Sequence, residues 1–588
     1  MVCLAACGEP AAHVQLAPVN PCMPVTGSSG LRVIAYTAGG EVRRPVPPTV
    51  IDAFPGDTEE LGVEVLGSAG EVIATGKTAP LEFASLPEGA QIPLVMAPLE
   101  GFCPVGQPED TRTAPSLARA GNGVLVVGGL SATGTPLATA EYYDAATTTF
   151  TPVAVPGAFD DPVNGFAGAV LTELPDGRVA ITGTARASLA YFDPATLEIS
   201  APVPFDVRAF HAAFALDQDH LMVMGGCAEV AAGACSGPVR HESYSYDLRD
   251  LTMRTKLPTL AQTETREGGT IFDLGIQADG VRRFALAGAD PAAGDRFALD
   301  DDTTEVMTGL RAQAALLDGG ALLSADAGGA VQVAPGGPPA AVTPPPAIAG
   351  MHLVSLEDGS VLAVGDQVVR YMPTTNTWTA AGVPPVSLAD ASLVRLPDGS
   401  VLVLAADRPW IYRPSLVGPQ SGQVVAAPDG TQQGVLTAPD VAATTRMPGH
   451  LYLDGDGARV LVGGTRTISG TVSASARVIA GGVALIAQQT GPGRAIVGRL
   501  VPGELARITR ADGTTCTGAA VLSDELTLPV SLAISGHTAT LAVGAVGSAT
   551  TKASCDLPDA GERGAWGLAA AGDGAQIDVG PVTVTRTR

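Results

Sequence analysis

The chain of 588 residues is 46% hydrophobic and only 16% charged, which supplies apolar material for large cores and excludes global disorder. Its formal net charge of −25 argues against nucleic-acid phosphates as partners, and the scattered Lys and Arg residues offer no basic cluster for anionic lipids. No run of about 18 apolar residues predicts a membrane-spanning helix. Short Val, Leu and Ile runs separated by Gly, Pro, Asp and Asn predict an all-β chain with frequent turns.

Residues 1–7 end in Leu4-Ala5-Ala6-Cys7, followed by Gly8. This stretch resembles the lipobox of bacterial lipoproteins, a family in which the cysteine becomes the lipidated first residue after signal cleavage. The resemblance implies that Cys7 carries a lipid anchor and that the protein is an outer-membrane or surface lipoprotein of the cell envelope. Residues 1–6 contain no Lys or Arg, so a working signal would need residues upstream of Met1. The alternatives are a secreted protein without an anchor, or a chance match.

Residues 8–105 alternate between apolar and polar positions, as in GLRVIAYTAGGEV and GVEVLGSAGEVIATG. This period-2 pattern is typical of antiparallel strands with one buried face. About seven strands in a segment of this length favour an immunoglobulin-like sandwich. The Pro- and Gly-containing stretch 106–113 is predicted to be a linker.

An Asx-Gly turn recurs through residues 114–418 at intervals of roughly 40 to 60 residues, each time between two apolar runs. This arrangement is the strongest short-range signal for a β-hairpin, because Asn and Gly accept the positive φ of tight turns. The turns are Asn122-Gly123, Asp176-Gly177, Asp279-Gly280, Asp318-Gly319, Asp358-Gly359 and Asp398-Gly399, with Asp219-His220 in the remaining place.

An aromatic strand and a closing apolar or aromatic residue follow each hairpin, as in YYDAATTTF (142–150) and YMPTTNTW (371–378). Four strands repeated at this period predict a β-propeller. The units resemble bacterial Kelch repeats, through the double glycines and the aromatic positions. The matching residues are Gly128-Gly129, Gly225-Gly226, Tyr142, Tyr191, Tyr244, Tyr371, Phe150 and Trp378. Counting the units predicts seven blades, or six if the fifth unit, which lacks both features, forms none.

Residues 419–588 are also rich in strand patterns but lack the repeat. Gly564-Ala565-Trp566-Gly567 and Val582–Thr585 resemble the Gly-aromatic-Gly turn and closing strand of concanavalin-like jelly-roll domains, such as laminin-G-like modules. The resemblance implies a second β-sandwich and an association with glycans or calcium. Asp454 and Asp456 are the candidate calcium ligands, although their run is too short for an EF-hand and favours a hairpin turn.

Eight cysteines are present, and setting aside Cys3 and Cys7 leaves six. The predicted pairs join neighbours along the chain: Cys22 with Cys103, Cys227 with Cys235, and Cys516 with Cys555. Spacing alone leaves other connectivities open, but disulfides in an oxidising compartment are the simplest account, since no CxxC or Cys/His cluster predicts a metal site.

No catalytic motif occurs, so we expect no cofactor, with calcium as the exception above. His211 and His352, with Arg208, Arg266 and Arg311, lie near blade starts and could line the axial channel, although buried structural roles are favoured for the histidines. The leading hypothesis is a non-catalytic surface protein that presents its propeller to a protein or glycan partner. The alternative is a carbohydrate-binding or carbohydrate-active protein with its site on the axis or in the C-terminal jelly-roll, and a structural envelope component is a third possibility. Positions where the repeat lapses, including the Cys227–Cys235 insertion and the two longest intervals, are the expected locations of function.

Overall fold

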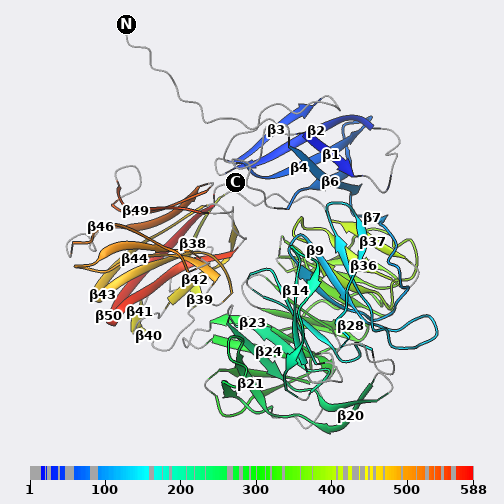
Figure 1. Cartoon of the computed structure of the whole chain (residues 1–588). Helices are drawn as coiled ribbons and strands as arrows, with labels where there is room; N and C mark the ends of the chain where they lie inside the picture. The colour runs from blue at the N-terminus through cyan, green and yellow to red at the C-terminus, as the bar shows by residue number, and fades with distance from the viewer. Residues whose placement is uncertain are drawn as a thin grey trace. The chain divides into compact units, whose positions relative to one another are not determined.

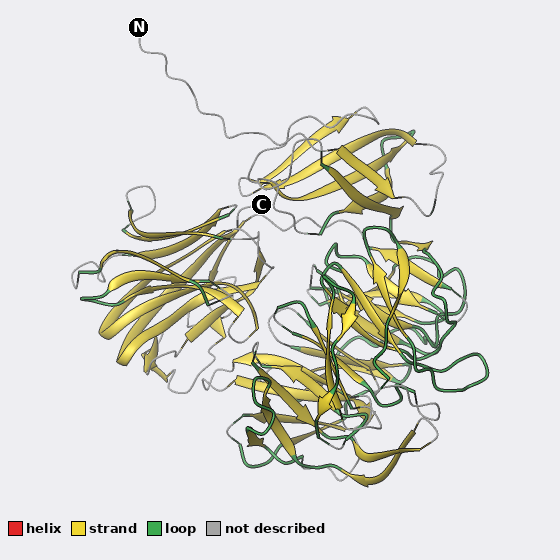
Figure 2. Cartoon of the chain, in the orientation of Figure 1, coloured by secondary structure: helices red, strands yellow, loops and turns green. Residues whose placement is uncertain are grey.

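The computed structural model contains only strands, turns and loops among the residues that it describes (Figure 2). The prediction of an all-β fold is therefore confirmed. No helix among these residues could span a membrane. The described residues are 15–19, 22, 28–37, 40–46, 58–79, 90–157, 165–174, 176–183, 188–206, 208–216, 219–231, 234–260, 269–276, 282–290, 293–299, 301–311, 313–317, 321–333, 338–357, 359–373, 375–405, 408–414, 422–426, 436–437, 444–447, 450–454, 459–467, 470–491, 494–510, 513–522, 529–535, 537–544, 549–557 and 564–586.

Residues 100–414 form consecutive antiparallel sheets built around four strands. The strands follow chain order except in the last sheet, and the second sheet has a short fifth strand. Each sheet is called a blade below and numbered in chain order. Blades 1 to 3 contain β8 (Ser116–Ala120), β9 (Gly123–Val127), β10 (Ala140–Asp144), β11 (Thr149–Val153); β12 (Val170–Glu173), β13 (Val179–Thr182), β14 (Ser188–Asp193), β15 (Glu198–Ile199); and β17 (Ala212–Ala215), β18 (His220–Met224), β21 (Ser243–Asp247), β22 (Arg254–Leu257). A short β16 (Val203–Pro204) pairs with β14.

Blades 4 to 7 have the same strand order, and the connections between their second and third strands are only a few residues long. The weak fifth unit of the sequence repeat forms a four-stranded sheet like the others. The strands are β23 (Thr270–Ile276), β24 (Arg282–Asp290), β25 (Ala293–Ala298), β26 (Glu305–Thr308); β27 (Gln313–Leu316), β28 (Leu322–Asp326), β29 (Gly329–Val333), β30 (Pro339–Ala341); β31 (His352–Ser355), β32 (Val361–Val364), β33 (Val368–Met372), β34 (Thr377–Ala380); and β35 (Ser392–Arg395), β36 (Val401–Leu404), β37 (Pro409–Arg413).

The first strands of neighbouring blades lie against one another around a closed series. Strand β8 contacts β12, β12 contacts β17, and β17 contacts β23. In blade 4 it is the second strand, β24, that contacts β27 of the next blade. Strand β27 then contacts β31, and β31 contacts β35. Strand β35 contacts β8, so the last blade meets the first. This closed ring of radially stacked sheets is a β-propeller, which confirms the predicted architecture.

The fourth strand of blade 7 comes from the other end of the chain. Strand β7 (Gly101–Pro104) pairs antiparallel with β37, from Trp410↔Pro104 to Arg413↔Gly101, and Figure 1 shows the two side by side. The predicted boundary at residue 105 placed these residues in the N-terminal domain, and it is wrong for this strand. The reason is physical: an outer strand without a partner would leave the edge of blade 7 open, and β7 covers it.

The two ends of each blade differ, and we name them by their connections. Because the strands are antiparallel, the turns between strands 1 and 2 and between strands 3 and 4 share one end, called here the hairpin face. The connections between strands 2 and 3, and from strand 4 to the next blade, share the opposite end, called the loop face. The chain enters β7 at Gly101 and leaves β37 at Arg413, which are paired residues on the hairpin face.

Three of the Asx-Gly turns, those that follow Leu174, Leu356 and Leu396, lie on the hairpin face and share one hydrogen-bonding pattern. In the last of them, Leu396 N donates to Ser400 O at 2.8 Å, and Gly399 N donates to Leu396 O at 3.0 Å. Gly399 has φ of +78°, which glycine tolerates and other residues resist. The same bonds occur at Leu174–Arg178 and Leu356–Ser360.

The rest of the described chain belongs to a second compact unit. Its N-terminal part is a six-stranded path, β1-β6-β5-β4-β2-β3, with alternate residues such as Leu61, Val63 and Val65 buried in one cluster. The strands are β1 (Gln15–Val19), β2 (Ser28–Thr37), β3 (Gly40–Val46), β4 (Thr58–Gly67), β5 (Val72–Lys77) and β6 (Gln91–Pro98).

The C-terminal part is built around two long strands, β43 (Gly470–Gly491) and β50 (Gly564–Arg586), which pair with each other. Gly564–Gly567, expected to form a turn, instead lies within β50, where Trp566 is fully buried and pairs with Val462. The remaining strands are β38 (Gly422–Ala426), β39 (Leu436–Thr437), β40 (Thr444–Met447), β41 (His450–Asp454), β42 (Arg459–Thr467), β44 (Arg494–Leu500), β45 (Leu505–Thr509), β46 (Thr515–Ala520), β47 (Val530–Ser535), β48 (Thr538–Val543) and β49 (Thr550–Asp556).

Candidate binding surfaces of the propeller

On the loop face, the connections between strands 2 and 3 are longest in blades 1 and 3. In blade 1, residues 128–139 join strands 2 and 3, and residues 130 and 132–135 are exposed. In blade 3, residues 225–242 make the same connection and contain a separate two-stranded sheet. Both segments fall in the longest intervals of the sequence repeat. The sequence therefore located the irregular loops correctly, and the structure shows that they share one face.

The inserted sheet of blade 3 is a hairpin closed by a disulfide. It consists of β19 (Cys227–Ala231) and β20 (Ala234–Val239), and Cys227 is bonded to Cys235. Cys227 is buried and forms an isolated bridge with Ala209, which fixes the base of the hairpin to the blade. Glu229, Ala231 and Ala234 are exposed farther along. The hairpin is therefore held at its base and presented to solvent beyond it.

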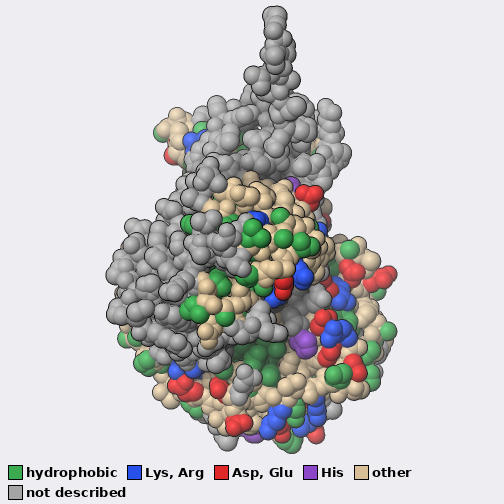
Figure 3. All heavy atoms as spheres, turned by 90° about the vertical axis from the view of Figure 1, so that its left-hand side faces the viewer, with side chains coloured by type: hydrophobic (Ala, Val, Ile, Leu, Met, Phe, Trp, Pro, Cys, Tyr) green, Lys and Arg blue, Asp and Glu red, His purple; other side chains and the backbone are tan. Residues whose placement is uncertain are grey.

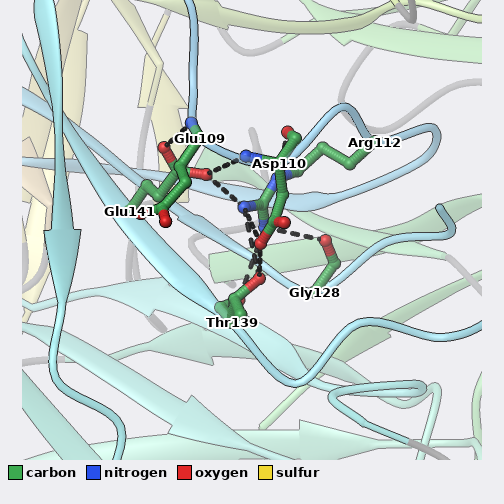
Figure 4. Close-up of polar contacts among 6 residues, drawn as sticks. All are labelled: Glu109, Asp110, Arg112, Gly128, Thr139 and Glu141. Carbon is green, nitrogen blue, oxygen red and sulfur yellow. Dashed lines mark hydrogen bonds and ion pairs between the residues drawn. The ribbon is translucent and has the colours of Figure 1, made fainter.

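A buried ion pair supports the loop of blade 1 (Figure 4). Arg112 and Glu141 pair while only 4% and 2% exposed, and Arg112 Nη1 also donates to Gly128 O at 3.0 Å. The second carboxylate oxygen of Glu141 accepts from the backbone N of Glu109 at 2.8 Å. Thr139 Oγ1 donates to Asp110 at 2.5 Å. These bonds tie both ends of the loop to the segment before β8, so the cluster is structural.

Arg208 holds the corresponding position in blade 3. It is 3% exposed, and its guanidinium donates to Gly225 O at 3.3 Å and Glu242 O at 2.9 Å. Asp206 pairs with it at 2.7 Å and accepts from Tyr246 at 2.8 Å. Although burial raises the pKa of Asp206, Arg208 and the hydrogen bonds outweigh burial and lower it overall. Arg208 therefore clamps the loop, and the expected axial position is wrong.

His211 is also buried between blades. Its Nε2 lies 2.9 Å from Thr182 Oγ1 on β13 of blade 2, and the side chain is 2% exposed. Burial, reinforced by the positive charge of Arg208, lowers the pKa of His211 to about 3. A side chain at Gly183 would collide with this imidazole. The structural role that the sequence favoured is the one observed.

The two remaining axial candidates that the structure describes belong to different blades. His352 is half-buried on β31 and contacts Ala389 O at 3.2 Å, and burial lowers its pKa. Arg311 lies 3.8 Å from Asp326 in blade 5. Arg266, Asp456 and Cys7 lie outside the described residues, as does the side chain of Asp454. No cluster of metal-ligating side chains occurs in the part of the chain that the structure describes.

The disulfide predictions agree with the structure. Cys227–Cys235 and Cys516–Cys555 are bonded, and Cys22 and Cys103 are disulfide-bonded as well. Sequence reasoning overlooked Arg112, although it stands before β8 at the same spacing at which Arg208 stands before β17. An alignment of blade starts would have found it. On the face drawn in Figure 3, acidic and basic side chains are interspersed over the described surface.

Comparison with known proteins identifies no family for this chain. No family model matches it, and no curated protein matches it. Among solved structures, it is similar to a streptogramin B lyase, with 10% identity and a TM-score of 0.38, covering 53% of this chain and 97% of the lyase. A chain of the mitotic checkpoint complex gives 11% identity and a TM-score of 0.37, covering 53% and 90%. Similarities this low carry no argument about function.

Proposed function

We propose that this protein is an exported, lipid-anchored, non-catalytic binding protein of the bacterial cell envelope. Its Kelch-type propeller presents the loop face to a protein or glycan partner, and the flanking domains, an immunoglobulin-like sandwich and a concanavalin-like jelly-roll, serve as spacer and accessory binder. The observation that carries the proposal is the concentration of the extra segments on one face, in blades 1 and 3.

The physical support comes from how these segments are held. A flexible loop loses conformational entropy on binding, and a disulfide within the loop reduces that cost. The Cys227–Cys235 bridge and the Arg112 and Arg208 clamps fix the loops before any partner arrives. Disulfides also persist in oxidising compartments, which supports an extracellular or envelope location.

Export and anchoring can be tested separately from binding. The gene, with its natural upstream sequence, should yield protein in the membrane fraction, whereas Cys7→Ser should yield soluble protein. Equal partitioning of the two forms would contradict a lipid anchor at Cys7.

Binding is tested with labelled full-length protein on a glycan array and on isolated envelope material. The test variant replaces residues 228–238 by two glycines and Cys227 by Ser, which removes the hairpin and leaves residues 227 and 239 to close a short turn. Arg249→Gln is the matched control, because Arg249 is an exposed residue of the same blade on the hairpin face. We expect saturable binding by wild type and control and at least a tenfold loss in the hairpin variant. Unaltered binding by that variant, or release of glycan fragments by the wild type, would overturn the proposal.

A further inference from the structure

The outer strand of blade 3 differs from every other outer strand of the propeller. Strand β22 reads Arg254-Thr255-Lys256-Leu257, with two basic residues. The described outer strands of the other blades, β7, β11, β15, β26, β30 and β34, contain no Lys or Arg. The chain as a whole has a net charge of −25, whereas this strand is positively charged.

The two basic side chains share one face of the blade with two tyrosines. Tyr244 pairs with Lys256 and Tyr246 with Arg254, and directly paired residues project from the same side of an antiparallel sheet. The guanidinium of Arg254 stacks on the ring of Tyr244 at 4.2 Å, and one N–H donates to Tyr246 Oη at 3.4 Å. Arg254 is nevertheless exposed.

A network behind the strand fixes this arginine. Tyr246 donates to Asp206, and Asp206 pairs with the buried Arg208, which lies 5.9 Å from the other ring, Tyr244. The acidic group nearest to the site in this network is therefore already neutralised. Stacking and hydrogen bonding pre-orient the guanidinium fork, and a fixed fork matches a carboxylate better than a freely rotating one.

The backbone of β22 adds a second kind of recognition. It is the last strand in the order β17-β18-β21-β22, so its outer edge pairs with no strand among the described residues. Extended chains can add to such an edge, and alternate side chains then lie about 7 Å apart along one face. Arg254 and Lys256 occupy alternate positions of β22, so both can face alternate side chains of an added strand. Their positive charge also disfavours pairing with a second basic strand edge.

We propose that the outer edge of blade 3 binds an extended acidic peptide segment as an added strand, with Asp or Glu at alternate positions opposite Arg254 and Lys256. This goes beyond the proposed binding function, because it adds a second site on the propeller and names the chemistry of its partner. The site is separate from the loop-face hairpin, so each can fail without the other.

The test uses the full-length protein and three labelled peptides in fluorescence polarisation: one alternating Glu and Thr, one alternating Gln and Thr, and one Glu-Thr peptide N-methylated on alternate amides. We expect the Glu-Thr peptide to bind in a salt-dependent manner and at least tenfold more tightly than the other two. The variant R254Q/K256Q should lose at least tenfold, whereas Arg249→Gln should bind like wild type. Thermal unfolding should be unchanged in both, because the altered side chains are exposed.

Each contrary result has a distinct meaning. Equal binding of the N-methylated peptide would overturn strand addition, and equal binding of the Gln peptide would overturn charge recognition. Tighter binding of polygalacturonate than of the Glu-Thr peptide would assign the site to an acidic polysaccharide instead. Failure of the peptides while the hairpin variant still loses its envelope partner would overturn this inference and leave the proposed function intact.

Discussion

On the hairpin face, turns from different blades share one hydrogen-bonding pattern, whereas on the loop face the connections differ in length from blade to blade. The turns at Leu174, Leu356 and Leu396 donate and accept at matching positions. The connections at 128–139 and 225–242 have no counterpart in blades 5 to 7, where the same strands are joined within a few residues. The comparison suggests that the hairpin face closes each blade, while the loop face is open to variation.

The largest effect is expected where the hairpin face contains a buried charge pair. Arg413 is fully buried, and its guanidinium meets Asp398 at 2.7 Å and the Asp398 carbonyl at 3.0 Å. Arg413→Ala would leave the carboxylate of Asp398 buried without this partner, which typically costs about 3–5 kcal/mol. Urea unfolding should show this loss. Arg249→Ala, which removes an exposed arginine from the same face, should change stability by less than about 0.5 kcal/mol.

A matched pair of glycines compares the two faces directly. Gly177 on the hairpin face and Gly226 on the loop face both have φ of +83°. A Cβ at Gly177 meets nothing within 4 Å, whereas at Gly226 it would press into the carbonyl oxygen of Ala209. Alanine should cost about 1 kcal/mol at Gly177, from backbone strain, and roughly 2–4 kcal/mol at Gly226, from strain and overpacking. Equal melting temperatures for the two variants would mean that a Cβ at Gly226 does not press against the carbonyl oxygen of Ala209.

The loop-face end of the seam between blades 2 and 3 should be sensitive to acid. Because the pKa of His211 falls from 6.5 unfolded to about 3 folded, the unfolded state binds the proton first as the pH falls. Stability is therefore fully present above pH 6.5 and declines between pH 6.5 and 3. The loss should be about 2 kcal/mol between pH 7 and pH 5, from about 1.4 kcal/mol per pKa unit. In the His211→Gln variant, the urea concentration at the unfolding midpoint should depend less on pH than in the wild type. The same pH dependence in both proteins would show that His211 is not the group responsible.

The smallest effect on global stability is expected from the inserted hairpin itself. Replacing Cys227 and Cys235 by Ser opens a short loop outside the four strands of blade 3. We expect the melting temperature to change little and protease cleavage within residues 228–238 to accelerate at least tenfold. The contrasting double variant, Cys516→Ser with Cys555→Ser, removes a bridge between β46 and β49, and should lower stability by about 3–4 kcal/mol. Similar losses in both would mean that the hairpin contributes to the propeller core.

Features encoded locally were predictable from the sequence. The Asx-Gly turns depend on a few adjacent residues, and the closing aromatics on a fixed spacing, which the structure shows as ring pairs at 5.0 Å between Tyr143 and Phe150 and between Tyr371 and Trp378. The sequence also located the long intervals that became the loops of blades 1 and 3.

Features that depend on distant partners were not predictable. The residues of β7 are as strand-like as those before them, and only pairing with β37 distinguishes them. Arg208 and His211 stand at a blade start, where a side chain can face the axis or a neighbouring blade, and one sequence does not separate these directions. The stacking of Arg254 on Tyr244 likewise joins residues that the repeat assigns to different strands.

Strand β7 also sets an order of events for the folding chain. It is synthesised before any of the propeller blades, yet its partner β37 is among the last propeller strands to be made. Joining the two closes a loop that contains all the other blades, which is the kind of distant contact that slows folding. Until then, blade 7 presents an unprotected edge. We expect the complete ring to appear late in refolding, and chains interrupted before Pro409 to remain open and prone to associate through their strand edges.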